Sequence, residues 1–304
     1  MKKFLLGCLI EIVLAIDLPK GEKIDSEQFS QFDKAYNYIA VTERYRREIK
    51  EAIDSNNTEK PLIVTEGATD WRHMKAAFQT LKDFEEYTWL NDLDFEFLEY
   101  SPINDEGDDD IRIRIKMSAD ELKSMALDYS KIPQKRRMIF VSDRDVPKIV
   151  NLFDGEDGYK NWGNNVYTMV LPIPDHRTET PDICVEHLYH DEDIVKWANI
   201  NNLQRRVFFG NEFNKSGHCY DGDTIYYCKD LNAVGPDKLT IIDGCNDKKV
   251  IKIGASESEN TNYALSKMNF AKMVLNKKEP FDTMDFKGFI RIFEVVKKIL
   301  EIQD

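Results

Sequence analysis

Two groups of carboxylates in this sequence have the residue types and spacing needed to bind a divalent cation. Glu66 and Asp70 form the first group, and Asp143 and Asp145 form the second. Four carboxylates gathered at one place repel one another unless protons or cations neutralise them. Oxygen ligands of this kind select hard cations, so one or two Mg²⁺ or Mn²⁺ ions are expected. Such ions support the hydrolysis of phosphate esters.

Each group directly follows a short apolar run. The runs Leu62–Thr65 and Met138–Val141 are rich in branched aliphatic residues and have the length of buried strands. A helix-length segment carrying Trp71, Met74 and Phe78 on one face follows the first group. This order predicts an α/β fold with a mostly parallel sheet flanked by helices. Because ligands bind at the carboxyl ends of the strands in such sheets, the two acidic groups are expected to converge.

Taken separately, each group also has an ordinary structural explanation. A Glu-Gly step after a strand is often a turn, and an Asp-x-Asp is often a helix cap with a surface charge. Asp70 is expected in the first turn of a helix that begins near Thr69, where an acid interacts favourably with the helix dipole. In that position it can also share a metal ion with Glu66.

In combination and in this order, the motif E-G-x-x-D at 66–70 and the motif D-R-D at 143–145 resemble the TOPRIM domain. This Rossmann-like family has a glutamate after its first strand and an Asp-x-Asp after a later one. The motifs are most similar to those of the nuclease branch that includes the OLD-type enzymes. The resemblance covers roughly residues 60–275, and it implies metal-dependent hydrolysis of phosphodiester bonds.

The resemblance also implies roles for two residues later in the chain. Glu186, in a predicted strand or helix start at 183–189, would complete the ligands of a second ion. Lys267, in the first turn of a helix predicted from Ser266, matches a lysine that OLD-type nucleases need for cleavage, and its charge would stabilise the phosphate. The ordinary alternatives are an edge-strand acid and a surface lysine. With a single ion, Glu66 would instead act as a general acid or base.

The charge distribution bears on nucleic acid as a partner. The net charge of −13 opposes phosphate binding, but residues 91–110 hold nine acidic side chains and no basic one, so much of the excess is local. We assign nucleic-acid binding to Arg144, between the two aspartates, and to Arg136 and Arg137, which enter the second predicted strand. The start of that strand lies at the opposite end from the carboxylates, which weakens the second assignment.

The chain is expected to contain an N-terminal helical segment (1–58), a TOPRIM-like catalytic domain with insertions (59–275) and a C-terminal helix packed on the core (276–304). Residues 1–16 look like an export signal, but Glu11 interrupts an apolar run that is too short to span a bilayer. Five cysteines without a CxxC pair indicate reduced thiols. We interpret the protein as cytoplasmic, without a membrane partner.

Several further elements are expected. The segments 94–100 and 111–115 alternate in polarity, which predicts either a hairpin or two edge strands. Ser118 opens a capping box before a helix that ends near Tyr129. In the less informative region that follows the predicted site, further strands are expected at 166–171, 205–209, 224–228, 239–242 and 250–253.

Zinc is a weaker alternative as a metal. His187 and His190 have a spacing that suits one face of a helix. No matching pair of cysteines or histidines lies at a usual distance in the sequence, so a structural zinc site is disfavoured.

OLD-type enzymes carry an ATPase domain, but no G-x-x-x-x-G-K-[ST] loop occurs in this sequence. The resemblance therefore implies a free-standing, homo-oligomeric effector nuclease of bacterial anti-phage defence, controlled by a separate ATPase. Its substrate would be DNA or RNA, with tRNA among the candidates. A primase or topoisomerase of the same family would need larger additional domains. Two alternatives stay open: hydrolysis of a small phosphorylated molecule, and a regulatory or binding module without activity.

Overall fold

The chain divides into two units, residues 1–55 and 56–304, and nearly all described residues belong to the second. The computed structural model describes residues 47, 51, 59–102, 111, 113–245, 249–254 and 261–302. The predicted N-terminal helical segment, including the signal-like start, therefore lies almost wholly outside the described residues. No helix in the described part is long and apolar enough to cross a membrane.

A five-stranded sheet with the order β2-β1-β3-β5-β4 forms the centre of the second unit. Four strands are parallel, and β4 is antiparallel at one edge. The strands are β1 (Leu62–Thr65), β2 (Glu96–Phe97), β3 (Met138–Ser142), β4 (Lys160–Asn161) and β5 (Val166–Val170). Every residue of β1, β3 and β5 is buried, which explains their unbroken apolar sequences. The expected mostly parallel sheet is confirmed.

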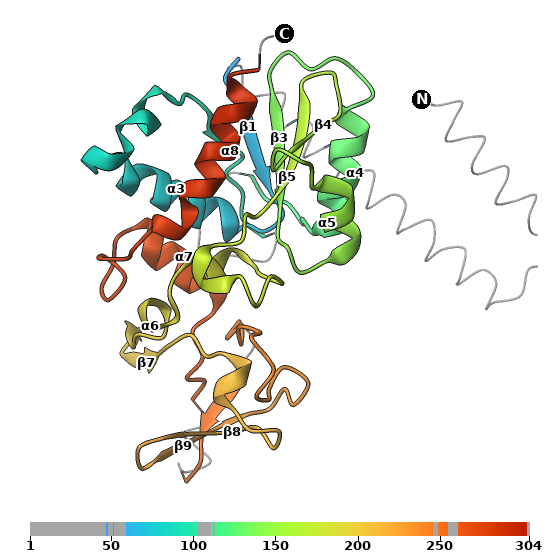
Figure 1. Cartoon of the computed structure of the whole chain (residues 1–304). Coiled ribbons are helices and arrows are strands. Elements are labelled where there is room, and N and C mark those ends of the chain that lie inside the picture. The colour runs from blue at the N-terminus through green and yellow to red at the C-terminus, as the bar shows by residue number, and fades with distance from the viewer. Residues whose placement is uncertain are drawn as a thin grey trace, which may run out of the picture. The chain divides into compact units, whose positions relative to one another are not determined.

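Helices cover both faces of this sheet (Figure 1). Ile63 and Ile139 lie side by side and face a core shared with α3, α7 and α8, whereas Phe140 faces Tyr129 of α4. The helices are α3 (Asp70–Leu81), α4 (Ala119–Tyr129), α5 (Pro147–Phe153), α7 (Lys267–Leu275) and α8 (Ile290–Leu300). Because successive side chains point to opposite faces, both faces of the sheet are apolar and both are covered by helices, which is the arrangement of an α/β fold.

The predicted helix start at Ser118 is confirmed, with Ser118 as the N-cap of α4. The Glu121 backbone N–H donates to the Ser118 hydroxyl at 3.5 Å, and that hydroxyl contacts the Glu121 carboxylate. The C-terminal helix expected within residues 276–304 is observed as α8, Ile290–Leu300. A 3-10 turn at Lys287–Phe289 precedes it, and the Phe289 N–H donates to the Phe286 carbonyl at 2.9 Å.

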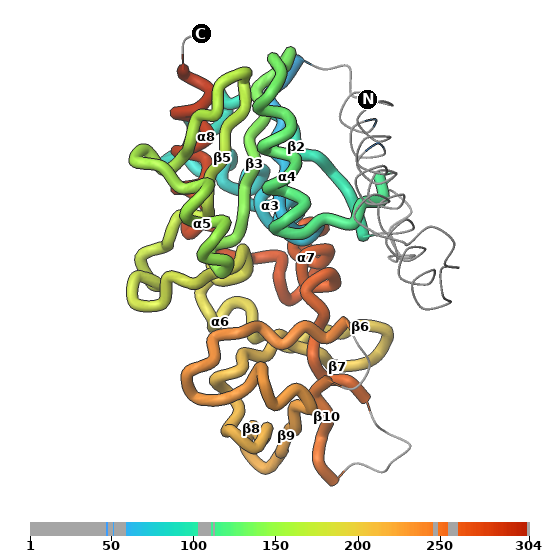
Figure 2. The backbone as a smooth tube through the Cα atoms, turned by 90° about the vertical axis from the view of Figure 1, so that its right-hand side faces the viewer, coloured from blue at the N-terminus to red at the C-terminus, as the bar shows by residue number. Residues whose placement is uncertain are grey.

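A β-rich insert, residues 198–265, lies between the short helix α6 (Asp191–Ile194) and α7. Its strands are β6 (Ala198–Ile200), β7 (Leu203–Arg205), β8 (His218–Asp221), β9 (Thr224–Cys228) and β10 (Val250–Lys252). A small core that includes Phe208, Phe213 and Tyr226 holds it together. Figures 1 and 2 show the insert beyond the carboxyl ends of the central strands, next to α7.

Several strand predictions outside the central sheet are wrong. The segments 205–209 and 239–242 form no strand of that length and meet through one bridge, Phe209 with Ile241. A hairpin of the segments near 100 and 114 is excluded, because the bridge between Ser101 and Arg114 is parallel. The conformation of these segments depends on contacts with residues distant in sequence. The alternation of polar and apolar residues within a segment does not predict such contacts.

Candidate metal centre

Three of the predicted ligands meet at the carboxyl edge of the central sheet. Glu66, Asp143 and Asp145 each place a carboxylate oxygen within 4.8 Å of the others. The reason is strand register, since Thr65 lies beside Val141 and the Glu66 N–H donates to the Val141 carbonyl at 3.1 Å. Among the described residues, no other group of three His, Cys, Asp or Glu side chains has this spacing.

Glu66 lies in a half-buried position where its charge is costly. Burial, followed by the charges of Asp70 and Asp145, raises the pKa of Glu66 to about 7. One of its oxygens, Oε2, is buried and accepts no hydrogen bond. A carboxylate in this environment gains either from a proton or from a nearby cation.

The carboxylate of Asp143 likewise lacks a positive partner among the described residues, and the pKa shift is larger. Burial, followed by the charges of Asp70 and Glu186, raises the pKa of Asp143 well above its ordinary value. Its Oδ1 is buried without a hydrogen-bond partner. Buried polar atoms in folded proteins are nearly always paired, so two such carboxylate oxygens in one group indicate a missing positive partner.

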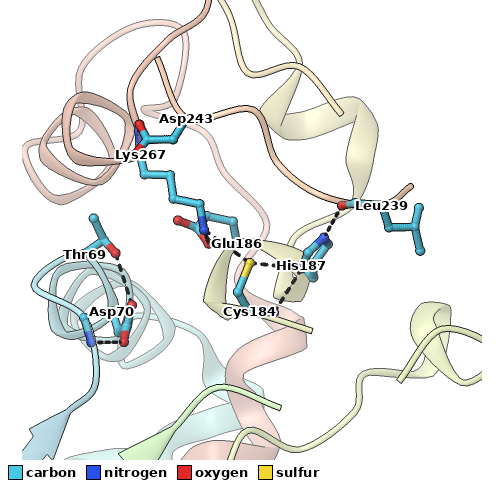
Figure 3. Close-up of polar contacts among 9 residues, drawn as sticks. Thr69, Asp70, Cys184, Glu186, His187, Leu239, Asp243 and Lys267 are labelled. Carbon is cyan, nitrogen blue, oxygen red and sulfur yellow. Dashed lines mark hydrogen bonds and ion pairs between the residues drawn. The ribbon is translucent and has the colours of Figure 1, made fainter. Parts of the chain in front are cut away.

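Asp70 lies beside this group, and its carboxylate is occupied within its own turn. The Gly67 N–H donates to Oδ2 at 2.6 Å, and the Thr69 hydroxyl donates to Oδ1 at 3.1 Å (Figure 3). A Cβ at position 67 would come within 2.6 Å of Oδ1, so a larger residue there would displace the Asp70 carboxylate. Burial, followed by the charge of Glu186, raises the pKa of Asp70 to about 6. Asp70 thus contacts its helix start while remaining electrostatically coupled to the site.

Glu186 and Lys267 form an ion pair on the other side of the site. The Lys267 Nζ donates to Glu186 Oε2 at 3.1 Å and lies 3.5 Å from the Cys184 Sγ (Figure 3). Glu186 is 1% exposed, on a 3-10 helix at Val185–Leu188. Burial has the largest single effect on the pKa of Glu186 and raises it. The charge of Lys267 nevertheless contributes to a final pKa of about 2. The second oxygen, Oε1, is buried and unpartnered.

His73 is a neighbour that the sequence analysis missed. It is fully buried on α3, three residues after Asp70, and its Nδ1 lies 2.9 Å from the Tyr189 hydroxyl. Its Nε2 has no partner. Burial, above all, lowers the pKa of His73 to about 4, so the ring is neutral near pH 7. The i, i+3 spacing from Asp70 is a signal that predicts this position on the same helix face.

His187 is not available as a zinc ligand in the observed arrangement. Its Nδ1 accepts the Cys184 backbone N–H at 3.1 Å, and its Nε2 donates to the Leu239 carbonyl at 2.9 Å. His190 stacks near His176 with ring centroids 4.4 Å apart. Within the described ranges, no three-residue group suited to a metal contains a histidine or cysteine.

The predicted nucleic-acid-binding arginines contact other parts of the protein. Arg144 donates to the Leu171 carbonyl at 2.9 Å and pairs with Asp154 at 3.2 Å. Arg136 is buried. Arg137 donates to the carbonyl of Leu300, the last residue of α8, and to the carbonyl of Ile302. Because Arg136 and Arg137 precede β3, they lie at the end of the strand opposite to the carboxylates, and the fold does not bring them to the site.

A scan against protein-family models, a search of curated proteins and a search of solved structures each return no match.

Proposed function

We propose that this protein is a metal-dependent nuclease that hydrolyses phosphodiester bonds of DNA or RNA. The observation that carries the proposal is the group of Glu66, Asp143 and Asp145, whose carboxylate oxygens lie within 4.8 Å of one another. Two buried oxygens of this group lack partners. An all-oxygen ligand set of this kind fits Mg²⁺ or Mn²⁺ and does not fit a softer metal.

The surrounding residues fit the same chemistry. Glu186 has one unpartnered buried oxygen, and its charge contributes to the raised pKa of Asp70, so we assign both residues as the ligands that would extend the set to a second ion. A bound divalent ion activates water and stabilises charge on the phosphate. In the alternative with a single ion that Glu66 does not bind, Glu66 would act as a general acid or base, and burial together with the charges of Asp70 and Asp145 raises its pKa to about 7. Lys267 supplies a positive charge for the phosphate.

The finer assignment rests on motif order alone. A glutamate after β1, an Asp-x-Asp after β3 and a lysine at the start of α7 occur in the order of a TOPRIM fold of the OLD-type branch. We extend the proposal to an effector nuclease of anti-phage defence, homo-oligomeric, cytoplasmic and controlled by a separate ATPase. The substrate within this proposal is DNA or RNA, including tRNA.

The direct test is cleavage of supercoiled plasmid, single-stranded DNA and total tRNA with Mg²⁺ or Mn²⁺. Glu66→Ala is expected to lower the rate by about 100-fold or more, and EDTA to abolish it. Glu85→Ala removes an exposed acid elsewhere and serves as the matched control. Equal cleavage by wild type and Glu66→Ala, insensitive to EDTA, would identify a contaminant and overturn the proposal. Absence of metal binding in calorimetry would overturn the metal site itself.

A second candidate, hydrolysis of a small phosphorylated molecule, is favoured by one observation. The chain carries a net charge of −13, and its predicted phosphate-binding arginines make contacts within the protein. A polynucleotide needs several cationic contacts, whereas a single phosphate needs few. Metal-dependent turnover of nucleotides without cleavage of polynucleotides would favour this candidate. Metal binding without turnover of either would favour a regulatory module.

A further inference from the structure

Two hydrogen bonds connect the insert to the Glu186–Lys267 pair, and both arise from one short segment. The Leu239 carbonyl accepts from His187 Nε2 at 2.9 Å, next to Glu186. Four residues later, the Asp243 carboxylate accepts from the Lys267 backbone N–H at 3.1 Å. Figure 3 shows this segment, 239–243, reaching the two elements that supply the pair.

The Asp243 contact determines how the lysine helix begins. Lys267 is the first residue of α7, and its N–H is one of the donors that a helix leaves without an internal partner. Asp243 accepts this N–H, while the Ser266 hydroxyl accepts from Asn269 at 3.1 Å. An acid at this end also interacts favourably with the helix dipole. The first turn of α7, from which the Lys267 side chain extends, is therefore in contact with the insert.

The segment is closely packed where it meets the entry to this helix. The Gly244 N–H donates to the Leu265 carbonyl at 3.3 Å. A Cβ at position 244 would lie 2.1 Å from the Ala264 carbonyl oxygen, a separation that no side chain tolerates. The end of segment 239–243 and the residues leading into α7 consequently form one packed unit.

The His187 contact fixes the turn that carries the acid. With Nε2 donating to Leu239, Nδ1 is left as an acceptor, and it receives the Cys184 backbone N–H at 3.1 Å. The ring thus connects Cys184, which precedes the short helix around Glu186, to the insert. Cys184 Sγ lies 3.1 Å from this Nδ1 and 3.5 Å from Lys267 Nζ. The thiol therefore contacts both His187 and Lys267.

We propose that segment 239–243 of the insert positions Glu186 and Lys267 for the reaction, with Asp243 and His187 as the positioning residues. This inference rests on the proposed function, in which Lys267 meets the phosphate and Glu186 holds a metal ion. The three-carboxylate group does not depend on the insert, because strand ends supply it. Loss of the segment's contacts is expected to slow the chemical step while leaving intact the binding of the ion held by the three-carboxylate group.

The test compares Asp243→Ala with Asp243→Asn, whose amide oxygen still accepts the Lys267 N–H. Asp243→Ala is expected to lower kcat by about tenfold or more, since small displacements of catalytic groups have effects of this size. The affinity for the ion held by the three-carboxylate group should stay within about twofold of wild type, and Asp243→Asn should restore most of kcat. Asp237→Ala, an exposed acid of the same insert, is the matched control. A kcat of Asp243→Ala equal to that of wild type would overturn the inference.

A second measurement does not require activity. The rate of Cys184 alkylation by iodoacetamide, followed by peptide mass spectrometry, reports the packing around the pair, since Cys184 is only 8% exposed. Asp243→Ala and His187→Ala should raise this rate several-fold, whereas Asp237→Ala and His187→Gln should not. If wild type cleaves nothing, the proposed function fails, and unchanged alkylation would separately overturn the positioning role. Asp243→Glu replaces Asp243→Ala in both measurements if the latter does not fold.

Discussion

The two sides of the candidate site treat buried negative charge in opposite ways. Glu66 belongs to a group without a protein cation in contact, and burial raises its pKa to about 7. Glu186 is buried more completely, yet its pKa falls to about 2 because Lys267 lies 3.1 Å away. On the first side, the charge is therefore left for a proton or a cation from solution to neutralise, whereas on the second side Lys267 already compensates one oxygen of Glu186. The raised pKa values make the first side the stronger candidate for metal ligands, and Glu186 can add only its unpartnered oxygen.

The two sides also differ in how the backbone supports them. Strand ends in a parallel sheet place Glu66 and Asp143, and the ladder between β1 and β3 sets their separation. A 3-10 turn and a helix start supply Glu186 and Lys267, which are far apart in sequence. Contacts through the insert hold the second side in place. We expect the first side to be more tolerant of changes outside the sheet.

The largest expected effect comes from removing a charge on the first side. Asp143→Asn keeps the size of the side chain but removes an anionic ligand, and metal affinity measured by calorimetry should fall by about 100-fold or more. The matched control is Asp83→Asn, an exposed position after α3. Unchanged affinity in Asp143→Asn would show that the group of three carboxylates is not the metal site.

Removing the internal cation from the second side should reduce stability. Lys267→Met leaves Glu186 buried without its partner, and the free energy of unfolding in urea should fall by about 3 kcal/mol near pH 7. Adding Glu186→Gln to this variant should recover much of the loss, because no uncompensated charge remains. Lys298→Ala, an exposed lysine of α8, controls for loss of charge alone. A double variant as unstable as the single one would contradict the pairing described here.

A smaller effect should appear in the pH dependence of the metal-free protein. The folded-state pKa values of Glu66 (about 7) and Asp70 (about 6) exceed the ordinary values of 4.5 and 3.8. The folded state therefore binds more protons in this window, and the free energy of unfolding should decline as pH rises from about 4 to about 7. Glu66→Gln should reduce this decline by roughly 1–3 kcal/mol. Urea titrations at several pH values, with EDTA present, measure the free energy of unfolding. A decline that is the same in Glu66→Gln and wild type would refute the raised pKa of Glu66.

Sequence reasoning succeeded where the determinants are local. The apolar runs ending in Glu66 and Asp143 predicted neighbouring parallel strands, and the expected convergence of Glu66, Asp143 and Asp145 is observed. Strand direction also explains why Arg136 and Arg137 lie away from the site. They precede β3, whereas the carboxylates follow it, so the two groups lie at opposite ends of the strand.

The second side was less accessible to prediction. Only a family resemblance connected Glu186 with Lys267, since no periodic pattern joins them. The Leu239 carbonyl is a backbone group and leaves no trace in the sequence. The role of Asp243 depends on an irregular segment packing against the start of α7, which propensities do not encode. Such contacts become visible only in three dimensions.

For protein engineering, the two contacts of segment 239–243 determine which parts of the chain can be exchanged. A chimera that replaces the insert inherits the three-carboxylate group unchanged, but it must supply its own acceptors for the Lys267 N–H and the His187 ring. A replacement chosen only to match the chain ends would therefore keep the three-carboxylate group but leave the start of α7 without its Asp243 acceptor. The insert and α7 are best transferred together as one module.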